Sequence, residues 1–409
     1  MLEYFIADED IRDRMLAGPM GPYLPPLAAR LVETGYSKAQ ARRLLVSADG
    51  LARWLHRNGI ALSDTGPDQV EAYSKSLGRM PSGKRLDTGT GLTRIAGLLR
   101  PWGILNASEP PDALDVFLER FDNHLRTVRG LAERTREHQY RHLRRFLGGI
   151  FTATRPEWSR LTPHYVAQFL ASELPKARAA KKHIVAAVRS VLRFLVLEGN
   201  VTKKLLKIIP RTRSWRYANL PEPLTPEQHE YVLKACQSEA YGLRRDRAFV
   251  ALLATLGVRG GELRQLCLED IDWKEGKVKI KGSKSARERV LPLPSDAGSL
   301  LGEYLQHERP LSPYREVFLT SIAPRKPLGG HGSTYLVREF LKKCGIEGPR
   351  LGTHCFRHTA ATMMVRNGAT LKEVADVLGH CSIATTSIYV KLDQPSLEGV
   401  AMPWPGGEQ

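Results

Sequence analysis

The sequence "ERTREHQYRHLRRFLGGI", residues 133–150, sets the fold class expected for the middle of this chain. Its apolar and aromatic side chains recur at helical spacing, which places Tyr140, Leu143, Phe146 and Leu147 on one side of a helix. Arginines fall largely between these positions. The stretch therefore predicts an amphipathic helix that carries positive charge outside its apolar stripe.

Two further helices are predicted downstream. Thr162 and Pro163 form a helix start, because threonine caps a helix and proline suits its first turn. The later stretch "KKHIVAAVRSVLRFLVLEGN" is helical up to Gly199, a typical stop residue. Together these patterns predict a bundle of four or five helices over residues 111–209.

The first hundred residues repeat this order weakly. The stretch "KAQARRLLVSADGLARWLHRNGI" parallels residues 133–150, and "TGTGLTRIAGLLRPWGIL" parallels the helix that ends near residue 199. Residues 1–108 thus predict an N-terminal helical domain. Two interpretations stay open: a divergent duplicate of the bundle, or a chance likeness between helices rich in leucine and arginine.

The net charge of +18 is concentrated in one part of the 409-residue chain. Residues 111–210 hold 19 Lys and Arg against 9 Asp and Glu, whereas residues 1–110 hold 14 against 12. A field of this kind favours a polyanion, most commonly nucleic acid, over a solvated face without a partner.

Beyond the bundle, residues 210–224 predict an extended basic linker, because their prolines break a helix. Thr225, Pro226 and Gln228 then form a helix-start signature, which places a domain boundary here. A second domain follows over residues 225–400, with residues 401–409 as a tail.

This second domain is expected to be mostly helical with one small sheet. "RDRAFVALLATLGV" predicts a buried helix, and "GKVKI" and "ERVLPL" predict two strands joined by the basic turn "KGSKSAR". Helices return from about Ser333, and "ATLKEVADVLGH" predicts a helix that ends at Gly379. The fold class predicted for the whole chain is mainly α with a small antiparallel β-sheet.

Several classes of protein are excluded by what the sequence lacks. It has no apolar run of about 18 residues, and its acidic start lacks a signal-peptide pattern, so a cytoplasmic protein is expected. Its five cysteines form no CxxC pair, which disfavours a disulfide framework. Neither an ATP-binding P-loop nor an acidic two-metal cluster is present.

The second domain contains cationic, histidine and tyrosine side chains that suit phosphate chemistry. Arginine fits it because its planar guanidinium donates to two phosphate oxygens. His354 and Arg357 are three residues apart and share one face of a helix. A helix start at Ser382 would let His380 and Tyr389 converge from different elements. The candidate residues are Arg259, Lys284, His354, Arg357, His380 and Tyr389.

A zinc site is the main structural alternative at these positions. Its ligands would come from His354, Cys355, His358, His380 and Cys381. Such a site would have to exclude Arg357 from the face that His354 and His358 share, and several cations would surround the metal. We therefore expect neither a metal nor a cofactor.

Four ordered motifs resemble the tyrosine recombinase family, also called the phage integrase family. "LGVRGGEL" resembles its first arginine box, "GSKSARERVLPL" its β-hairpin, "THCFRHTAAT" its HxxR box and "LGHCSIATTSIYV" its terminal box. The resemblance covers roughly residues 111–400. It implies a helical core-binding domain over residues 111–209 and a mixed α/β catalytic domain over residues 225–400.

The resemblance implies a site-specific DNA recombinase that integrates or transposes a mobile element. Tyr389 would attack a DNA phosphodiester and form a 3′-phosphotyrosyl link, and Arg259 and Arg357 would stabilise the charge on the phosphate. Lys284 would protonate the leaving 5′-oxygen, with Lys281 as the competing lysine. The resemblance also implies that His354 accepts the proton of Tyr389 and that His380 donates a hydrogen bond to the phosphate.

The partners implied are double-stranded DNA and a homo-tetramer on two DNA sites, with or without partner recombinases. The segment "DQPSLEGVAMPWP", after Tyr389, is a candidate for exchange between subunits. Two alternative functions stay open: a non-catalytic DNA-binding accessory protein of the same fold, and a type IB-like topoisomerase.

Overall fold

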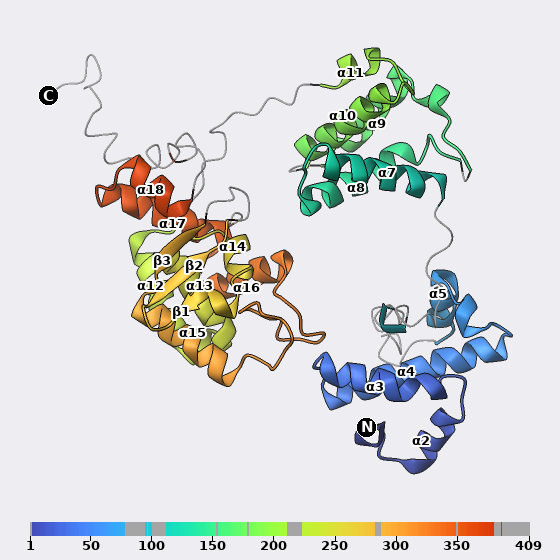
Figure 1. Ribbon diagram of the computed structural model, residues 1–409, viewed down its shortest axis with the longest axis horizontal. Helices are drawn as coiled ribbons and strands as arrows, with labels where there is room; N and C mark the ends of the chain where they lie inside the picture. Colours follow the sequence, from blue (N-terminus) through green and yellow to red (C-terminus); the bar gives the residue numbers. More distant parts are fainter. Residues whose placement is uncertain are drawn as a thin grey trace. The chain divides into compact units, whose positions relative to one another are not determined.

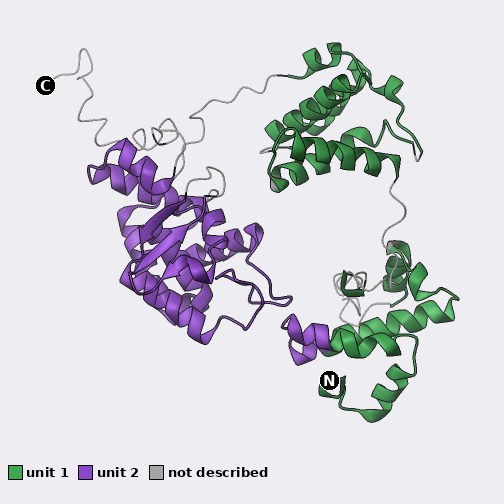
Figure 2. Ribbon diagram, viewed as in Figure 1, with its two compact units in different colours: residues 1–28, 42–215 green, residues 29–41, 216–409 purple. Residues whose placement is uncertain are grey.

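A computed structural model describes most of the chain (Figure 1). The described residues are 2–77, 95, 97–99, 112–152, 154–177, 180–210, 223–282, 288–348, 351–379 and 386. Contacts divide the chain into two compact units (Figure 2). Unit 1 comprises residues 1–28 and 42–215, and unit 2 comprises residues 29–41 and 216–409.

The first 76 residues contain five α-helices. Their bounds are α1 Leu2–Phe5, α2 Glu9–Leu16, α3 Leu24–Glu33, α4 Lys38–Arg57 and α5 Pro67–Ser76. The long helix α4 covers the first half of the expected internal repeat. Most of the second half, residues 88–105, lies outside the described residues, so the duplication stays a prediction.

The predicted helical bundle is confirmed, with four long helices and one short one. Their bounds are α7 Ala113–Thr127, α8 Glu133–Leu147, α9 Pro163–Glu173, α10 Lys181–Leu197 and α11 Lys204–Ile208. The Thr162 hydroxyl accepts a hydrogen bond from the Tyr165 N–H at 3.2 Å, as expected of a cap. Gly199 has a φ of +76° two residues after α10 ends, so it stops this helix as predicted.

The prediction for the apolar stripe of α8 was wrong at one residue, Tyr140. Leu143, Phe146 and Leu147 are fully buried in the core of the bundle. Tyr140 instead is 39% exposed, and its hydroxyl donates to the Asp115 carboxylate at 3.2 Å. The hydroxyl of a tyrosine can stay at the surface and form a hydrogen bond there, while part of the ring is buried.

The C-terminal part of unit 2, from residue 223 on, contains a three-stranded antiparallel sheet surrounded by helices. The strands are β1 Ile271–Asp272, β2 Lys277–Ile280 and β3 Arg289–Pro292, in the order β1-β2-β3. The helices are α12 Pro226–Cys236, α13 Arg244–Leu256, α14 Gly260–Arg264, α15 Ser295–His307, α16 Gly330–Lys343, α17 Thr353–Arg366 and α18 Leu371–Leu378. The predicted fold class is therefore confirmed, although the two-residue strand β1 was not expected.

Helix α15 corrects the expectation that helices return only near residue 333. Glycines at 298 and 302 weaken its local helical signal. Leu300, Leu301 and Tyr304 nevertheless lie at helical spacing and pack into the same core as α13. Tertiary burial thus decides the conformation of this segment.

Two left-handed glycines end the helices that lead to the candidate site. Gly257 follows α13 with a φ of +61°, and Gly379 follows α18 with a φ of +63°. Thr370 begins α18 through a capping box with Glu373. The predicted end at Gly379 is confirmed, and each glycine leads into one of the motifs that contain candidate site residues.

A buried hydrogen bond fixes the start of the C-terminal part of unit 2. The Leu224 N–H donates to the Thr359 hydroxyl on α17 at 2.8 Å. Thr225 and Gln228 form the predicted capping box of α12. Residues 211–222 of the predicted linker and the segment after residue 386 lie outside the described residues. Among the helices that are described, none has the length and apolarity needed to cross a membrane.

Candidate active site

Arg259 lies where the chain turns from α13 into α14. Glu262, one helical turn later, folds back on it, because its carboxylate accepts the Arg259 backbone N–H at 3.0 Å. The same carboxylate accepts the Arg259 Nη1 at 2.8 Å. The guanidinium is thereby fixed at the start of a short helix.

Glu262 also holds a second arginine, Arg289 of β3. The Arg289 Nη2 donates to its carboxylate at 2.7 Å, and the Glu262 side chain is fully buried. Burial raises the pKa of Glu262, but hydrogen bonds from Arg289 and Arg259 outweigh it, so the pKa lies below its usual value. The carboxylate is therefore ionised at neutral pH and binds both cations.

Arg357 joins the ends of two helices. Its guanidinium is buried, with Nη1 donating to the Gly257 carbonyl at 3.2 Å and Nη2 to the Leu378 carbonyl at 2.6 Å. Both carbonyls lie at helix C-termini, where the backbone dipoles favour positive charge. This places Arg357 of the HxxR box against both the first arginine box and the terminal box.

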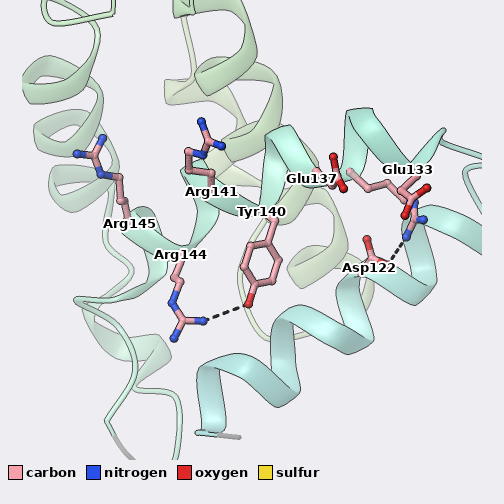
Figure 3. A pocket seen from close by; sticks show the side chains of 8 residues that line it. Asp122, Glu133, Glu137, Tyr140, Arg141, Arg144 and Arg145 are labelled. Carbon is pink, nitrogen blue, oxygen red and sulfur yellow. Dashed lines mark hydrogen bonds and ion pairs between the residues drawn. The ribbon is translucent and has the colours of Figure 1, made fainter. Parts of the chain in front are cut away.

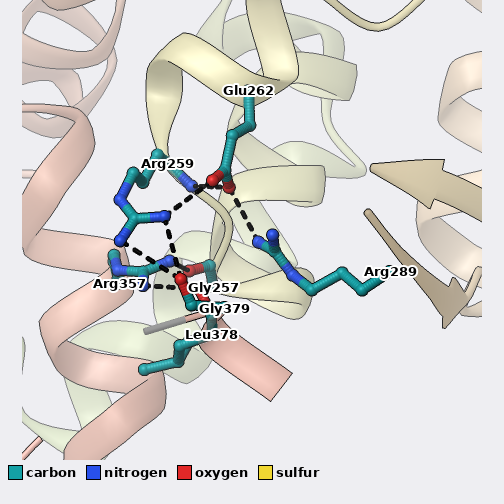
Figure 4. A network of polar contacts seen from close by, with 7 residues as sticks. All are labelled: Gly257, Arg259, Glu262, Arg289, Arg357, Leu378 and Gly379. Carbon is teal, nitrogen blue, oxygen red and sulfur yellow. Dashed lines mark hydrogen bonds and ion pairs between the residues drawn. The ribbon is translucent and has the colours of Figure 1, made fainter. Parts of the chain in front are cut away.

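Gly379 completes the cluster (Figure 4). Its carbonyl accepts hydrogen bonds from Nη1 and Nη2 of Arg259 at 3.4 and 3.5 Å. The Arg289 Nη1 lies only 2.8 Å from the position that a Cβ on residue 379 would occupy. Residues of all four motifs therefore meet at this turn, directly before His380.

The two histidines of α17 differ in their surroundings. His354 is exposed, whereas His358 is partly buried and their ring centroids lie 6.3 Å apart. Burial lowers the pKa of His358 to about 4, and the charges of His354 and Arg357 add to the effect. His358 is thus neutral at physiological pH.

The zinc alternative finds no support in the described residues. Cys355 is 2% exposed, and its side chain packs in the hydrophobic core. No group of three or more His, Cys, Asp or Glu side chains that could hold a metal occurs in the described part of the chain. His380 and Cys381 of the imagined ligand set lie outside it.

Of the two candidate lysines of the hairpin, Lys281 lies within the described residues. Lys281 forms an ion pair with the buried Asp270 carboxylate at 2.8 Å. The hydrogen bond to Asp270 raises the pKa of Lys281. Lys284 lies outside the described residues, as do His380, Tyr389 and the predicted cap Ser382.

Two residues of the cluster had no assigned role in the sequence. These are Glu262 and Arg289, neither of which was among the six predicted site residues. A signal for Arg289 exists in its spacing. It stands two positions before the buried Leu291 on β3, and residues i and i+2 of a strand share one face.

A second charged feature lies on α7 and α8 in the helical bundle. A hollow of about 710 Å³ lies here. Figure 3 shows Arg141, Arg144 and Arg145 toward one end of it and carboxylates toward the other. Arg144 pairs with Asp115, and Arg145 pairs with Glu173. Arg141 is exposed and forms no ion pair within the described residues. The hollow is lined by Asp122, Glu133, Arg136, Glu137, Tyr140, Arg141, Arg144 and Arg145.

Two family models match the two regions that contain these features. Residues 222–395 match the model described as the phage integrase family. Residues 118–199 match the model described as the N-terminal SAM-like domain of phage integrases. Both matches lie within the span of the predicted resemblance.

Full-length relatives extend the similarity to the N-terminal block. A Sinorhizobium fredii protein named "Putative integrase/recombinase y4rA" is 31% identical over 414 residues, which cover 100% of both chains. Another from the same organism, "Putative integrase/recombinase y4rF", is 34% identical over 422 residues and covers 100% of this chain and 96% of its own.

A solved structure shares the fold. It is the XerH site-specific recombinase bound to a palindromic difH substrate in a post-cleavage complex. The match has a TM-score of 0.53 at 20% identity and covers 82% of this chain and 94% of that chain.

Proposed function

This chain belongs to the phage integrase family, the tyrosine recombinases, and on that premise we propose that it cuts and rejoins DNA strands at specific sites. The proposed chemistry is attack of Tyr389 on a DNA phosphodiester. This step forms a 3′-phosphotyrosyl bond and releases a 5′-hydroxyl. A 5′-hydroxyl of another strand then attacks the phosphotyrosine and restores the DNA backbone.

The observation that carries this proposal is the arginine cluster around Gly379. Arg259 and Arg357 come from motifs about a hundred residues apart, yet both bond to the turn at the end of α18. Preorganised guanidinium groups of this kind suit the negative charge that develops on the non-bridging oxygens of a phosphate under attack. Since His380 follows Gly379 directly, the terminal box starts beside both arginines.

The remaining roles are assigned to groups that can move a proton. We assign His354, which is exposed on α17, as the acceptor for the Tyr389 proton. A free tyrosine has a pKa of about 10, so its attack at neutral pH needs such an acceptor or a positive field. His380 is assigned as a hydrogen-bond donor to the phosphate.

Lys284 is the preferred general acid for the leaving 5′-oxygen. A general acid works best with a pKa near the working pH. The hydrogen bond to Asp270 raises the pKa of Lys281 and so moves it farther from the working pH. It also engages the ammonium group of Lys281. Lys281 therefore suits an anchoring role at the base of the hairpin.

The proposed substrate is double-stranded DNA, bound by the basic helical bundle and the catalytic domain, which residues 210–224 link. The net charge of residues 111–210 supports this assignment, because phosphate contacts dominate the affinity of proteins for DNA. We further propose a homo-tetramer on two DNA sites, cytoplasmic location and a role in moving a mobile element. The domain bounds and the site residues belong to the same proposal.

The test is a nicked suicide substrate, in which the released strand segment diffuses away and traps the covalent intermediate. Wild-type protein should form a protein–DNA adduct, and Tyr389→Phe should form none while it still binds DNA. Tyr335→Phe, an exposed tyrosine on α16, is the matched control and should react like the wild type. Absence of an adduct with wild-type protein, or equal adduct with Tyr389→Phe, would contradict the proposal.

A further inference from the structure

Arg289, the first residue of β3, is a buried cation with incomplete hydrogen bonding. Its side chain is 10% exposed, and only its Nη2 donates to Glu262. Its Nε and Nη1 atoms are buried and have no hydrogen-bond partner within the part of the chain that the structure describes. Buried donors without an acceptor are costly, so an acceptor that arrives from outside binds favourably there.

The neighbours of Arg289 place these donors at the candidate active site. Arg289 and Arg259 reach the Glu262 carboxylate from opposite sides (Figure 4). The close approach of Arg289 to Gly379 depends on the missing Cβ of that residue. Arg289 thus borders the same turn to which Arg259 donates its hydrogen bonds.

The charge of the cluster also suits a third guanidinium. Within the described residues, Arg259, Arg289 and Arg357 supply three positive charges against the single negative charge of Glu262. A phosphodiester carries one negative charge, and its pentavalent transition state carries two when a tyrosine oxygen attacks. The net positive charge of two therefore matches the transition state better than the bound substrate.

We propose that Arg289 is a third phosphate-binding guanidinium, which donates from Nη1, the atom beside Gly379, to a non-bridging oxygen of the DNA phosphate under attack. Glu262 holds it in place through Nη2. This inference rests on the proposed function, because it assigns a further catalytic residue to the same reaction. It differs from a purely structural role, in which Arg289 would only balance the charge of Glu262.

The experiment compares Arg289→Gln with wild type on two nicked suicide substrates. One carries the natural phosphodiester at the cleavage site, and the other carries a methylphosphonate, which lacks one charged oxygen. Arg289→Gln should slow adduct formation on the phosphodiester by about 10²–10³-fold, the usual effect of losing a preorganised donor. On the neutral methylphosphonate the deficit should shrink to about tenfold or less, since the charge that Arg289 binds is absent.

Lys277→Gln provides the matched control. Lys277 is an exposed cation on β2 of the same hairpin and pairs with Glu275 at 3.5 Å. Its loss removes one charge from the hairpin without touching the cluster, so adduct formation should stay near the wild-type rate on both substrates.

Three outcomes separate the inference from its alternatives. An equal deficit on both substrates, or no deficit at all, would overturn it and leave Arg289 a structural role. If Arg289→Gln does not fold, Arg289→Lys takes its place in the same comparison, because lysine can keep the ion pair with Glu262 but lacks the planar fork. A wild-type protein that forms no adduct would instead count against the proposed function.

Discussion

Glu262 is the residue on which the geometry of the candidate site depends. Its buried carboxylate binds Arg259 from the same helical turn and Arg289 from a strand far along the chain. Removal of the carboxylate would leave two cations close together without their shared counter-charge. A substitution at Glu262 therefore affects both arginines, although Glu262 itself need not contact DNA.

His358 makes the catalytic domain sensitive to acid. Its pKa is lowered to about 4 in the folded protein, mainly by burial, whereas the unfolded chain takes up the proton near pH ~6.5. The unfolded state then binds more protons between these pH values. Stability is complete above about pH 6.5 and falls as the pH drops toward 4.

We expect His358→Gln to flatten this part of the pH profile. The contribution lost by the wild type between pH 7.5 and 4.5 is roughly 2–3 kcal/mol, because one pKa unit equals about 1.4 kcal/mol. Thermal unfolding of both proteins at several pH values measures it. His331→Gln, at an exposed position on α16, should keep the wild-type slope, and equal slopes for all three proteins would refute the assignment.

At the residue scale, the sequence motifs named candidate residues but not the contacts between them. Arg259 and Arg357 were predicted from motifs, and the structure places both at one turn. The role of Arg289 was not predicted, because a basic residue near a hairpin turn is usually solvated. Its burial depends on Gly379 and Glu262, which no local pattern connects with it.

The β2–β3 hairpin is anchored where its described strands enter the turn. Lys281 binds Asp270 at one end, and Arg289 binds Glu262 at the other. Both carboxylates are buried, although the Lys281 side chain is 44% exposed. The two described strand ends that flank residues 283–287 are therefore each anchored by an ion pair.

The two hairpin lysines can be told apart by the leaving group. We expect Lys284→Ala to lose cleavage of a normal substrate and to regain it when a 5′-bridging sulfur replaces the leaving oxygen, because a thiolate leaves without a general acid. Lys281→Ala should lose far less activity, and sulfur should not change its deficit. Single-turnover cleavage rates measure both, and rescue of Lys281→Ala instead would reverse the assignment.

Helix α8 offers a separate test of DNA binding. Arg141 is exposed beside Arg144 and Arg145, whose guanidinium groups pair with carboxylates. Arg141→Ala should weaken binding and reduce the slope of log affinity against log salt by about 1, as expected for one lost phosphate contact. Arg43→Ala on α4 removes the same charge from the near-neutral N-terminal block and should leave the slope unchanged.

Elements with strong local signals were predicted well. The cap at Thr162, the capping box at Thr225 and the glycine stop at Gly379 all lie where the sequence placed them. Helix α15 was missed because its glycines lower the helix propensity of the segment. Its helical conformation depends instead on packing into the same core as α13. Strand β1 was missed because two residues carry no periodicity.

For the whole molecule, the proposed chemistry would need neither a metal nor a nucleotide. A phosphotyrosyl link would conserve the bond energy, and the arginines would supply the positive charge that a metal otherwise provides. We expect adduct formation in excess EDTA and without ATP to match the rate with magnesium within about twofold. A rate that requires magnesium would contradict this expectation, and nicked-substrate cleavage measures it directly.

The hydrogen bond between Leu224 and Thr359 has a mechanical consequence. Leu224 is one of the first described residues after the stretch 211–222, and Thr359 lies two residues beyond Arg357 on α17. Leu224 also packs into the hydrophobic core, so the first described residues of this region are fixed both to that core and to the helix that carries His354 and Arg357. Removal of the Thr359 hydroxyl would therefore leave the Leu224 N–H without its acceptor on the helix that carries two candidate site residues.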